Sequence, residues 1–164
     1  MADIRKIKVL LESVENLAPS GLAIAFHIRL TSPDFLFQTY PKDWTDIYSE
    51  KGYVMQDPIV RWGFTETGSI RWTLLAEMDD HNILEQSLTF GMKYGVAIAT
   101  DTGRSRSFAG FSRPDREYTD AEIDQLSQCV QALHDMTASQ DGMDESWRTE
   151  LHQLSVKMTH ATTT

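Results

Sequence analysis

A cluster of polar aromatic side chains surrounds one Asp-Pro step in a short stretch of this chain. The aromatic residues are Tyr40, Trp44, Tyr48 and Trp72, and the step is Asp57-Pro58. An indole N–H can only donate a hydrogen bond, a phenol can donate or accept one, and a carboxylate can only accept one. Inside an apolar pocket, such a set would fix a ligand that carries both a carbonyl group and an N–H group.

A purely structural interpretation is available for each of these residues taken alone. Aromatic side chains usually belong to the core. An Asp before Pro commonly starts a helix, with the Asp as N-cap and the Pro as the first helical residue. Trp44 and Tyr48 are four positions apart and would share one face of a helix. For any single residue we favour the structural interpretation, and only the ordered set argues for a ligand.

Taken together, the ordered set resembles the autoinducer-binding domain of LuxR-type quorum-sensing regulators. The residues that match in order and spacing are Tyr40, Trp44, Tyr48, Asp57, Pro58 and Trp72. Gly91 and Gly95 follow in the segment FGMKYG, where the family also has an FG…G segment. The resemblance covers roughly residues 1–138. It implies a domain that binds an N-acyl-homoserine lactone inside an α-β-α sandwich.

The family resemblance implies a role for each polar residue of the set. Trp44 would donate its indole N–H to the lactone carbonyl, and Asp57 would accept the amide N–H of the ligand. Tyr40 would hydrogen-bond the amide carbonyl, while Tyr48 and Trp72 would wall the lactone head group. A buried Asp57 left without its donor would cost about 1–3 kcal/mol, so an apolar mimic that lacks the N–H should be rejected.

Two parts of the ligand site are placed by counting along strands rather than by a motif. Many family members carry a Ser or Thr on the last hairpin strand that supports the amide carbonyl of the ligand. Counting from Gly103, that position falls on Ala109, and Ser107, two residues earlier on the same strand face, is the candidate replacement. The acyl tail is expected to lie between the sheet and the helices. The tail positions expected from alternation are Ile24, Phe26, Val96, Ile98 and Phe108.

The elements that must position these residues follow from hydrophobic periodicity. Apolar residues at helical spacing predict a helix over residues 3–18 and another from Thr119, where Glu122 completes a capping box. Alternating apolar residues between turn signals predict strands. The expected extended segments are residues 22–30, 35–40, 69–72, 95–100 and 107–112, and the shorter helices are residues 41–48, 57–64 and 81–91. This order predicts an α+β fold, an α-β-α sandwich with a central antiparallel sheet flanked by helices.

Composition restricts the partners and the compartment of the protein. The 164 residues carry a net charge of −9, which repels phosphate backbones, and they contain no run of Lys and Arg, so direct DNA binding is not expected. The single cysteine, Cys129, excludes an internal disulfide and fits a reducing compartment. The first residues lack a continuous apolar run. We therefore expect no signal peptide, no membrane span and a cytoplasmic protein.

No catalytic or metal-binding pattern accompanies these features. The sequence contains no GxSxG, HExxH, Walker or GxGxxG motif, and it lacks the HxHxDH motif of the metallo-lactonases that degrade acyl-homoserine lactones. Asp79-Asp80-His81 is interpreted as a polar helix cap, because its spacing matches no zinc site. We predict that the protein is not an enzyme and holds neither a cofactor nor a metal.

Residues 139–164 are expected to form a polar linker and a C-terminal helix outside the ligand domain of residues 1–138. The helix would run from Asp144 to Met158. Its apolar face would carry Trp147, Leu151, Leu154 and Met158. The segment LHQLSVKMTH resembles the run-in to the helix-turn-helix domain of family members. We therefore expect a chain without a DNA-binding domain of its own.

Two functions from different classes remain open. The first is a receptor domain that binds an acyl-homoserine lactone signal. The second is an interaction protein, or anti-activator, that inactivates a full-length LuxR-type activator by forming a defective heterodimer. The intact ligand set favours the first function, and the missing DNA-reading domain favours the second. Because family members act as dimers, the resemblance also implies a homodimer.

Overall fold

An antiparallel sheet of five strands forms the middle layer of the molecule, in the order β2-β1-β5-β4-β3. The computed structural model describes residues 4–30 and 32–138. The strands are β1 (Gly21–Arg29), β2 (Ser32–Gln38), β3 (Gly68–Arg71), β4 (Tyr94–Asp101) and β5 (Arg106–Arg113). Ile24 of β1 pairs with Phe37 of β2 on one side and with Ala109 of β5 on the other. Paired residues on neighbouring strands therefore point their side chains to the same face, and each face of the sheet is one continuous surface.

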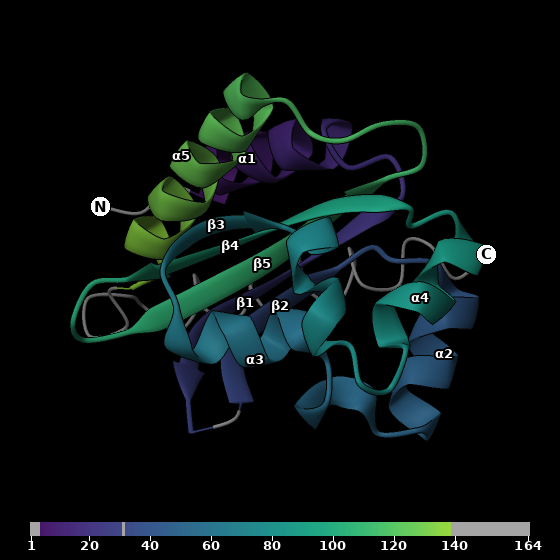
Figure 1. Cartoon of the computed structure of the whole chain (residues 1–164). Helices are drawn as coiled ribbons and strands as arrows, with labels where there is room; N and C mark the ends of the chain where they lie inside the picture. The colour runs from purple at the N-terminus through teal and green to yellow at the C-terminus, as the bar shows by residue number, and fades with distance from the viewer. Residues whose placement is uncertain (1–3, 31, 139–164) are drawn as a thin grey trace.

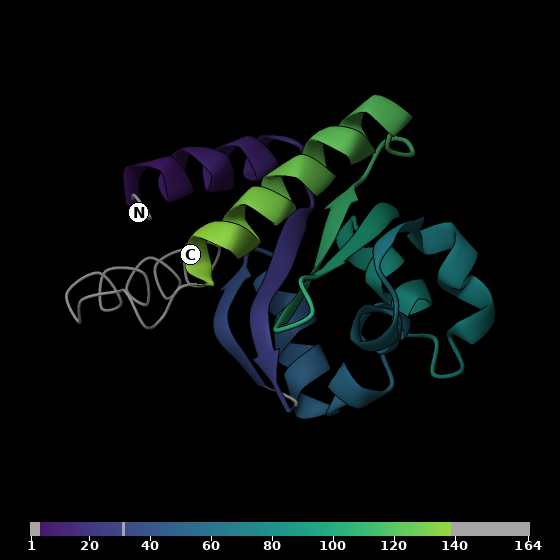
Figure 2. The ribbon, with the colours of Figure 1, turned by 90° about the vertical axis from the view of Figure 1, so that its left-hand side faces the viewer.

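Two long helices, α1 (Ile4–Asn16) and α5 (Asp120–Thr137), cover one face of the sheet, which we call the closed face (Figures 1 and 2). Both helices bury an apolar stripe at helical spacing. The buried stripe residues include Ile7, Leu11 and Val14 of α1 and Leu126, Val130 and Leu133 of α5. They pack on the large side chains of the strands, among them Leu22, Ile24, Phe26, Val96, Ile98 and Phe111. This cluster is the main hydrophobic core.

Short helices cover the opposite face, which we call the pocket face (Figure 1). They are α2 (Lys42–Glu50), η1 (Tyr53–Met55), α3 (Pro58–Thr65), η2 (Trp72–Met78), α4 (Ile83–Ser87) and η3 (Leu88–Phe90). A second apolar cluster on this face joins Trp44, Ile59, Trp62, Trp72, Leu75, Ile83, Met92, Ala97 and Ala99. Helices on both sides of the sheet confirm the predicted α-β-α sandwich.

Most elements predicted from the sequence are present, and the local signals act as expected. Asp57 is the N-cap of α3 and accepts a hydrogen bond from the backbone N–H of Ile59, with Pro58 at the first helical position. Thr119 and Glu122 form the capping box at the start of α5. The 3₁₀ turns η1 and η2 were not predicted, whereas η3 lies within the helix predicted over residues 81–91.

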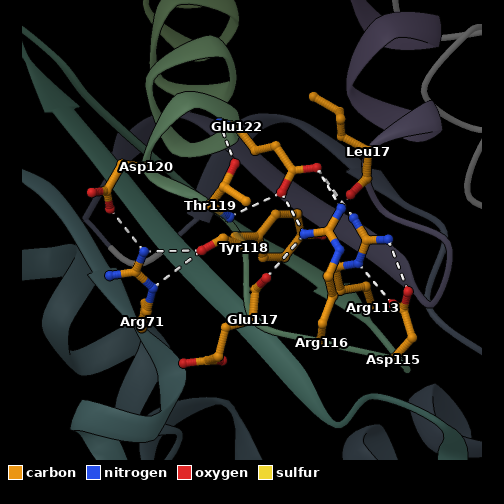
Figure 3. A network of polar contacts seen from close by, with 10 residues as sticks. All are labelled: Leu17, Arg71, Arg113, Asp115, Arg116, Glu117, Tyr118, Thr119, Asp120 and Glu122. Atoms are coloured by element: carbon orange, nitrogen blue, oxygen red, sulfur yellow. Dashed lines mark hydrogen bonds and ion pairs between the residues drawn. The ribbon is translucent and has the colours of Figure 1, made fainter.

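A polar network fixes the start of α5 against the rest of the fold (Figure 3). The hydroxyl of Tyr118 donates to the carbonyl oxygen of Leu17 at 2.6 Å. The guanidinium of Arg71, the last residue of β3, donates to the carbonyl oxygen of Tyr118 at 2.9 Å. Glu122 pairs with Arg113 and Arg116, and the hydrogen bond from Arg116 lowers the pKa of Glu122 to about 2. The network therefore ties α1, β3 and β5 to the start of α5.

The C-terminal predictions cannot be compared with the structure. The expected linker and the helix from Asp144 to Met158 lie outside the described residues, as do Trp147, Leu151 and Leu154. Within residues 4–30 and 32–138, no helix has the length and apolar character needed to cross a membrane.

Candidate functional site

A cavity of about 290 Å³ lies between the pocket face of the sheet and the short helices. Its lining comes from β1, β2, β5, α2, η1, α3, η2 and α4. The residues predicted from the sequence that line it are Tyr40, Trp44, Tyr48, Asp57 and Trp72. Among the lining residues in the described part of the chain, Asp57 is the one with a formal charge at neutral pH. The structure thus brings the four aromatic residues and Asp57 to one largely apolar cavity.

Asp57 is a buried acceptor with two functions in the fold. Its Oδ1 accepts from the backbone N–H of Ile59 at 2.8 Å, and its Oδ2 accepts from the hydroxyl of Tyr48 at 2.7 Å. Burial raises the pKa of Asp57 to about 6, although both hydrogen bonds act in the opposite direction. Each carboxylate oxygen has a further lone pair. An N–H group of a ligand could therefore bind Asp57 without displacing Tyr48 or opening the helix cap.

Trp72 lines the same cavity and carries a buried donor. Only 5 % of the residue is exposed, and its indole Nε1 has no hydrogen-bond partner within the described part of the chain. A buried donor left unpaired costs about 1–3 kcal/mol. A ligand with an acceptor at this place would recover that free energy.

Three glycines provide room for aromatic side chains that line the cavity. A Cβ atom added to Gly110 of β5 would lie 2.7 Å from the hydroxyl oxygen of Tyr40, and one added to Gly63 would lie 2.5 Å from the ring of Phe108. A Cβ on Gly95 would come closer still to the ring of Trp72. These contacts are far shorter than van der Waals distance. The three rings can therefore occupy these positions only because residues 63, 95 and 110 are glycines, which have no Cβ atom.

The structure does not bring Ser107 to the cavity. Its side chain is fully buried on the closed face, where its Oγ accepts from the backbone N–H of His27 at 2.9 Å and lies 2.7 Å from Nδ1 of His134. Side chains alternate along a strand, so Ser107 and Ala109 share the closed face. Phe108 and Gly110 are the cavity-facing residues of β5, and neither carries a hydroxyl group.

The expected course of the acyl tail is also corrected. Ile24, Phe26, Val96 and Ile98 belong to the core of the closed face, and only Phe108 lines the cavity. Alternation showed that two faces exist but not which one is hollow. The lining residues that sequence reasoning missed include Ala23, Ala25, Leu36, Val54, Val60, Ile83 and Met92. The small residues alternating with large ones along β1 were the available signal.

The Asp79-Asp80-His81 segment is part of a helix start. Asp79 Oδ1 accepts from the backbone N–H of Ile83 at 2.8 Å, and its Oδ2 accepts from that of Glu85 at 3.2 Å. Among the residues the structure describes, no group of three or more His, Cys, Asp or Glu side chains is placed to hold a metal ion.

Comparison with known sequences gives one family. A model described as the autoinducer binding domain matches residues 22–140. The transcriptional activator protein SolR of Ralstonia nicotianae is 29 % identical over 93 residues, which are 56 % of this chain and 39 % of SolR. The transcriptional activator protein VanR of Vibrio anguillarum is 33 % identical over 70 residues, 42 % of this chain and 29 % of VanR. The matched regions are thus well under half the length of these relatives.

Several solved structures have a similar fold. Escherichia coli SdiA superposes with a TM-score of 0.60 at 18 % identity, covering 84 % of this chain and 64 % of that one. CepR2 of Burkholderia cenocepacia, described as an N-acylhomoserine lactone-dependent LuxR family factor, gives a TM-score of 0.60 at 19 % identity and 79 % coverage of both chains. SdiA in complex with octanoyl-rac-glycerol gives 0.58 at 21 % identity, covering 85 % of this chain and 61 % of that one. At these identities the likeness concerns the fold.

Proposed function

Because this chain belongs to the family of autoinducer-binding domains, as the match over residues 22–140 shows, we propose that its cavity binds an N-acyl-homoserine lactone. The family is one of signal-binding domains of LuxR-type transcription regulators rather than of enzymes. The proposed domain comprises residues 1–138 and acts in the cytoplasm without contacting DNA itself. The acidic net charge of −9 supports the last point.

The observation that carries the proposal is a buried acceptor and a buried donor in one apolar cavity. The carboxylate of Asp57 is buried, with 7 % of the residue exposed, and the indole N–H of Trp72 has no partner among the described residues. An acyl-homoserine lactone offers an amide N–H to the acceptor and two carbonyl oxygens to donors. We propose that Asp57 accepts the amide N–H and that Trp44, Tyr40 and Trp72 face the carbonyl groups. Tyr48 holds Asp57 in place and walls the head group.

The proposal is tested by calorimetry with a matched pair of ligands. One is octanoyl-homoserine lactone, and the other has an ester oxygen in place of the amide N–H. Loss of a hydrogen bond to a buried charged acceptor costs about 1.5–3 kcal/mol, so the ester should bind roughly 10- to 100-fold more weakly. Equal affinities would show that Asp57 does not accept a hydrogen bond from the amide N–H. If a panel of acyl lactones gives no binding at all, the proposed function is wrong.

A second candidate function, an anti-activator that pairs with a full-length LuxR-type protein, is favoured by one surface feature. A groove of about 350 Å³ between α1 and α5 is lined by Val9, Leu10 and Met136 together with Arg5 and Lys6. Val9 is 61 % exposed, and with Leu10 and Met136 it forms an apolar patch bordered by two basic residues, the kind of surface that can contact another protein. We propose that this groove contributes to a homodimer and to a heterodimer with a relative.

Analytical ultracentrifugation of the wild type and of Val9→Glu tests the dimer. A charge in the groove should raise the dimer dissociation constant at least tenfold and leave lactone binding unchanged. Co-expression with a LuxR-type activator then tests the heterodimer, because an anti-activator lowers the output of a reporter in proportion to its own abundance. A monomer at high concentration, with no effect on the reporter, would contradict this candidate.

A further inference from the structure

The cavity is closed at one end and open at the other. Trp44, Asp57 and Trp72 at the polar end are all buried. Among the other lining residues, Leu36 is 40 % exposed and Val54 is 48 % exposed, and Ser49 is exposed as well. Solvent therefore reaches the cavity where β2, α2 and η1 contribute these residues to its lining.

Between the polar end and the open end, the cavity is lined by mostly apolar residues of the hairpin of β1 and β2. Lining residues of β2 and its extension occur in the order Pro33, Leu36, Gln38, Tyr40 from the turn toward the polar end. Leu36 pairs with Ala25 of β1, and Pro33 pairs with Ile28, which both line the cavity as well. At about 3.3 Å per residue, Leu36 lies roughly 13 Å from Tyr40 along the strand. A ligand whose head group contacts Tyr40 thus reaches the opening with an extended tail.

The chemistry of the opening fits an alkyl chain. The opening is formed by Leu36 and Val54, with the small hydroxyl of Ser49, and none of these three residues carries a charge. Val54 follows Tyr53 on η1, a single 3₁₀ turn that begins after Gly52 in a left-handed conformation. The exposed parts of Leu36 and Val54 are apolar surface in contact with water, and a passing methylene chain would cover them.

We infer that the acyl tail leaves the cavity between Leu36 and Val54, so that the site accepts signal molecules with long or end-substituted tails. This inference rests on the function proposed above, because it places the head group at Asp57. The head group is then selected by the closed polar end. The length of the tail affects the affinity only for the part of the tail that lies inside the cavity.

The test uses acyl-homoserine lactones in pairs, each with and without a bulky dye on the last tail carbon. Each buried methylene should raise the affinity about fourfold, and methylenes beyond the opening should add almost nothing. A dye on a butanoyl tail should abolish binding, because the dye would have to enter the cavity. The same dye on a dodecanoyl tail should change the affinity less than threefold.

A variant that narrows the opening sharpens the experiment. Val54→Trp should reduce the affinity for the dye-capped dodecanoyl lactone at least tenfold more than the affinity for the hexanoyl lactone. Leu74→Trp is the matched control, because Leu74 is exposed on η2 and does not line the cavity, and it should not change this ratio.

The outcomes separate the inference from the proposed function. If uncapped lactones bind but every dye-capped lactone is excluded, the tail end is closed and the inference is wrong while the receptor stands. An affinity that falls steeply beyond one tail length has the same meaning. If no lactone binds, capped or uncapped, the proposed function itself fails.

Discussion

The two faces of the sheet are built from the same strands but from side chains of opposite size. Toward the closed face, β1 and β4 carry Leu22, Ile24, Phe26, Val96 and Ile98. Toward the pocket face, the alternating positions are Ala23 and Ala25 of β1 and Ala97 and Ala99 of β4. Large side chains fill the space under two long helices. Small ones leave the volume that becomes the cavity, so a single strand can serve a close-packed core and a ligand site at once.

The two faces also differ in how their buried polar groups are partnered. On the closed face, Nε2 of His27 lies 3.0 Å from the carbonyl oxygen of His134 and must carry the proton, because a carbonyl can only accept. Nδ1 of His27 then accepts from Ser105 at 2.6 Å, and Nδ1 of His134 has Ser107 at 2.7 Å. On the pocket face, Trp72 Nε1 has no partner in the described residues.

Two polar side chains that lie close together need not form a functional site, and their existing hydrogen-bond partners show whether they have a structural role. Ser107 and His134 have the spacing of a nucleophile and its base. Ser107, however, is completely buried, and its Oγ is already bound to the backbone of His27. The pair fixes the end of α5 on the sheet. Among the described residues, the buried side-chain atoms without a partner are Trp72 Nε1 and Glu117 Oε1 in the loop before α5, and of these two residues Trp72 is the one that lines the cavity.

The first prediction concerns the core under the closed face, where a substitution should have the largest effect on the free energy of unfolding. Phe26 is fully buried and meets Phe37 edge to face, with ring centroids 5.7 Å apart. Phe26→Ala should reduce the free energy of unfolding by about 3–5 kcal/mol. Phe108→Ala, next to the existing cavity, should cost less because its ring is only partly surrounded. Urea unfolding of both variants measures the difference, and equal losses would contradict the contrast between the faces.

The second prediction concerns the polar end of the cavity. Asp57→Asn keeps a good N-cap for α3 but replaces one acceptor oxygen with a donor. The lactone affinity should fall roughly 10- to 100-fold, while the unfolding free energy changes little. Trp44→Phe keeps most of the apolar area and should weaken binding less. An Asp57→Asn protein with unchanged affinity would leave Asp57 with the cap as its only function.

The third prediction tests the close contact between Tyr40 and Gly110 of β5. Gly110→Ala places a methyl group 2.7 Å from the hydroxyl oxygen of Tyr40, and such overpacking typically costs about 1–3 kcal/mol. The double variant Gly110→Ala with Tyr40→Phe removes the clashing atom and should recover most of that loss. A thermodynamic cycle over the four proteins measures the coupling. Additive effects would show that Tyr40 does not rest on Gly110.

How much the sequence could predict differs between the two faces as well. The closed face follows from periodicity, because α1 and α5 each show a long apolar stripe and Thr119 with Glu122 marks a helix start. The polar end of the pocket follows from the order of Tyr40, Trp44, Tyr48, Asp57 and Trp72.

The misplaced residues share one physical cause. Alternate side chains of a strand point to opposite faces, and the face with the large side chains was taken for the ligand face, which is why Ser107 and the tail positions Ile24 and Phe26 were assigned to the cavity. All three are buried on the closed face instead. What the sequence lacked was information on which face the short helices leave hollow, and this depends on packing between segments far apart in the chain.

The last prediction uses pH, because the two faces should respond with opposite signs. Burial lowers the pKa of His27 and of His134 on the closed face. The groups facing them are Asp34 and Arg29 near His27, Asp135 and Asp101 near His134, and each other. Since the unfolded chain takes up these protons more readily, their contribution to stability is present above pH 6.5 and is lost as the pH falls below it.

On the pocket face, Asp57 behaves in the opposite way. Its pKa is raised from 3.8 to about 6 by burial, so its contribution to stability is present below pH 4 and is lost as the pH rises through 6. An amide N–H of a ligand binds the ionised carboxylate, and the lactone affinity should therefore rise by roughly tenfold between pH 5 and pH 7. Calorimetry over this range, with Asp57→Asn as the control, measures the slope. A wild type as insensitive to pH as Asp57→Asn would show that the carboxylate is ionised throughout and that the pocket does not hold it in a desolvated site.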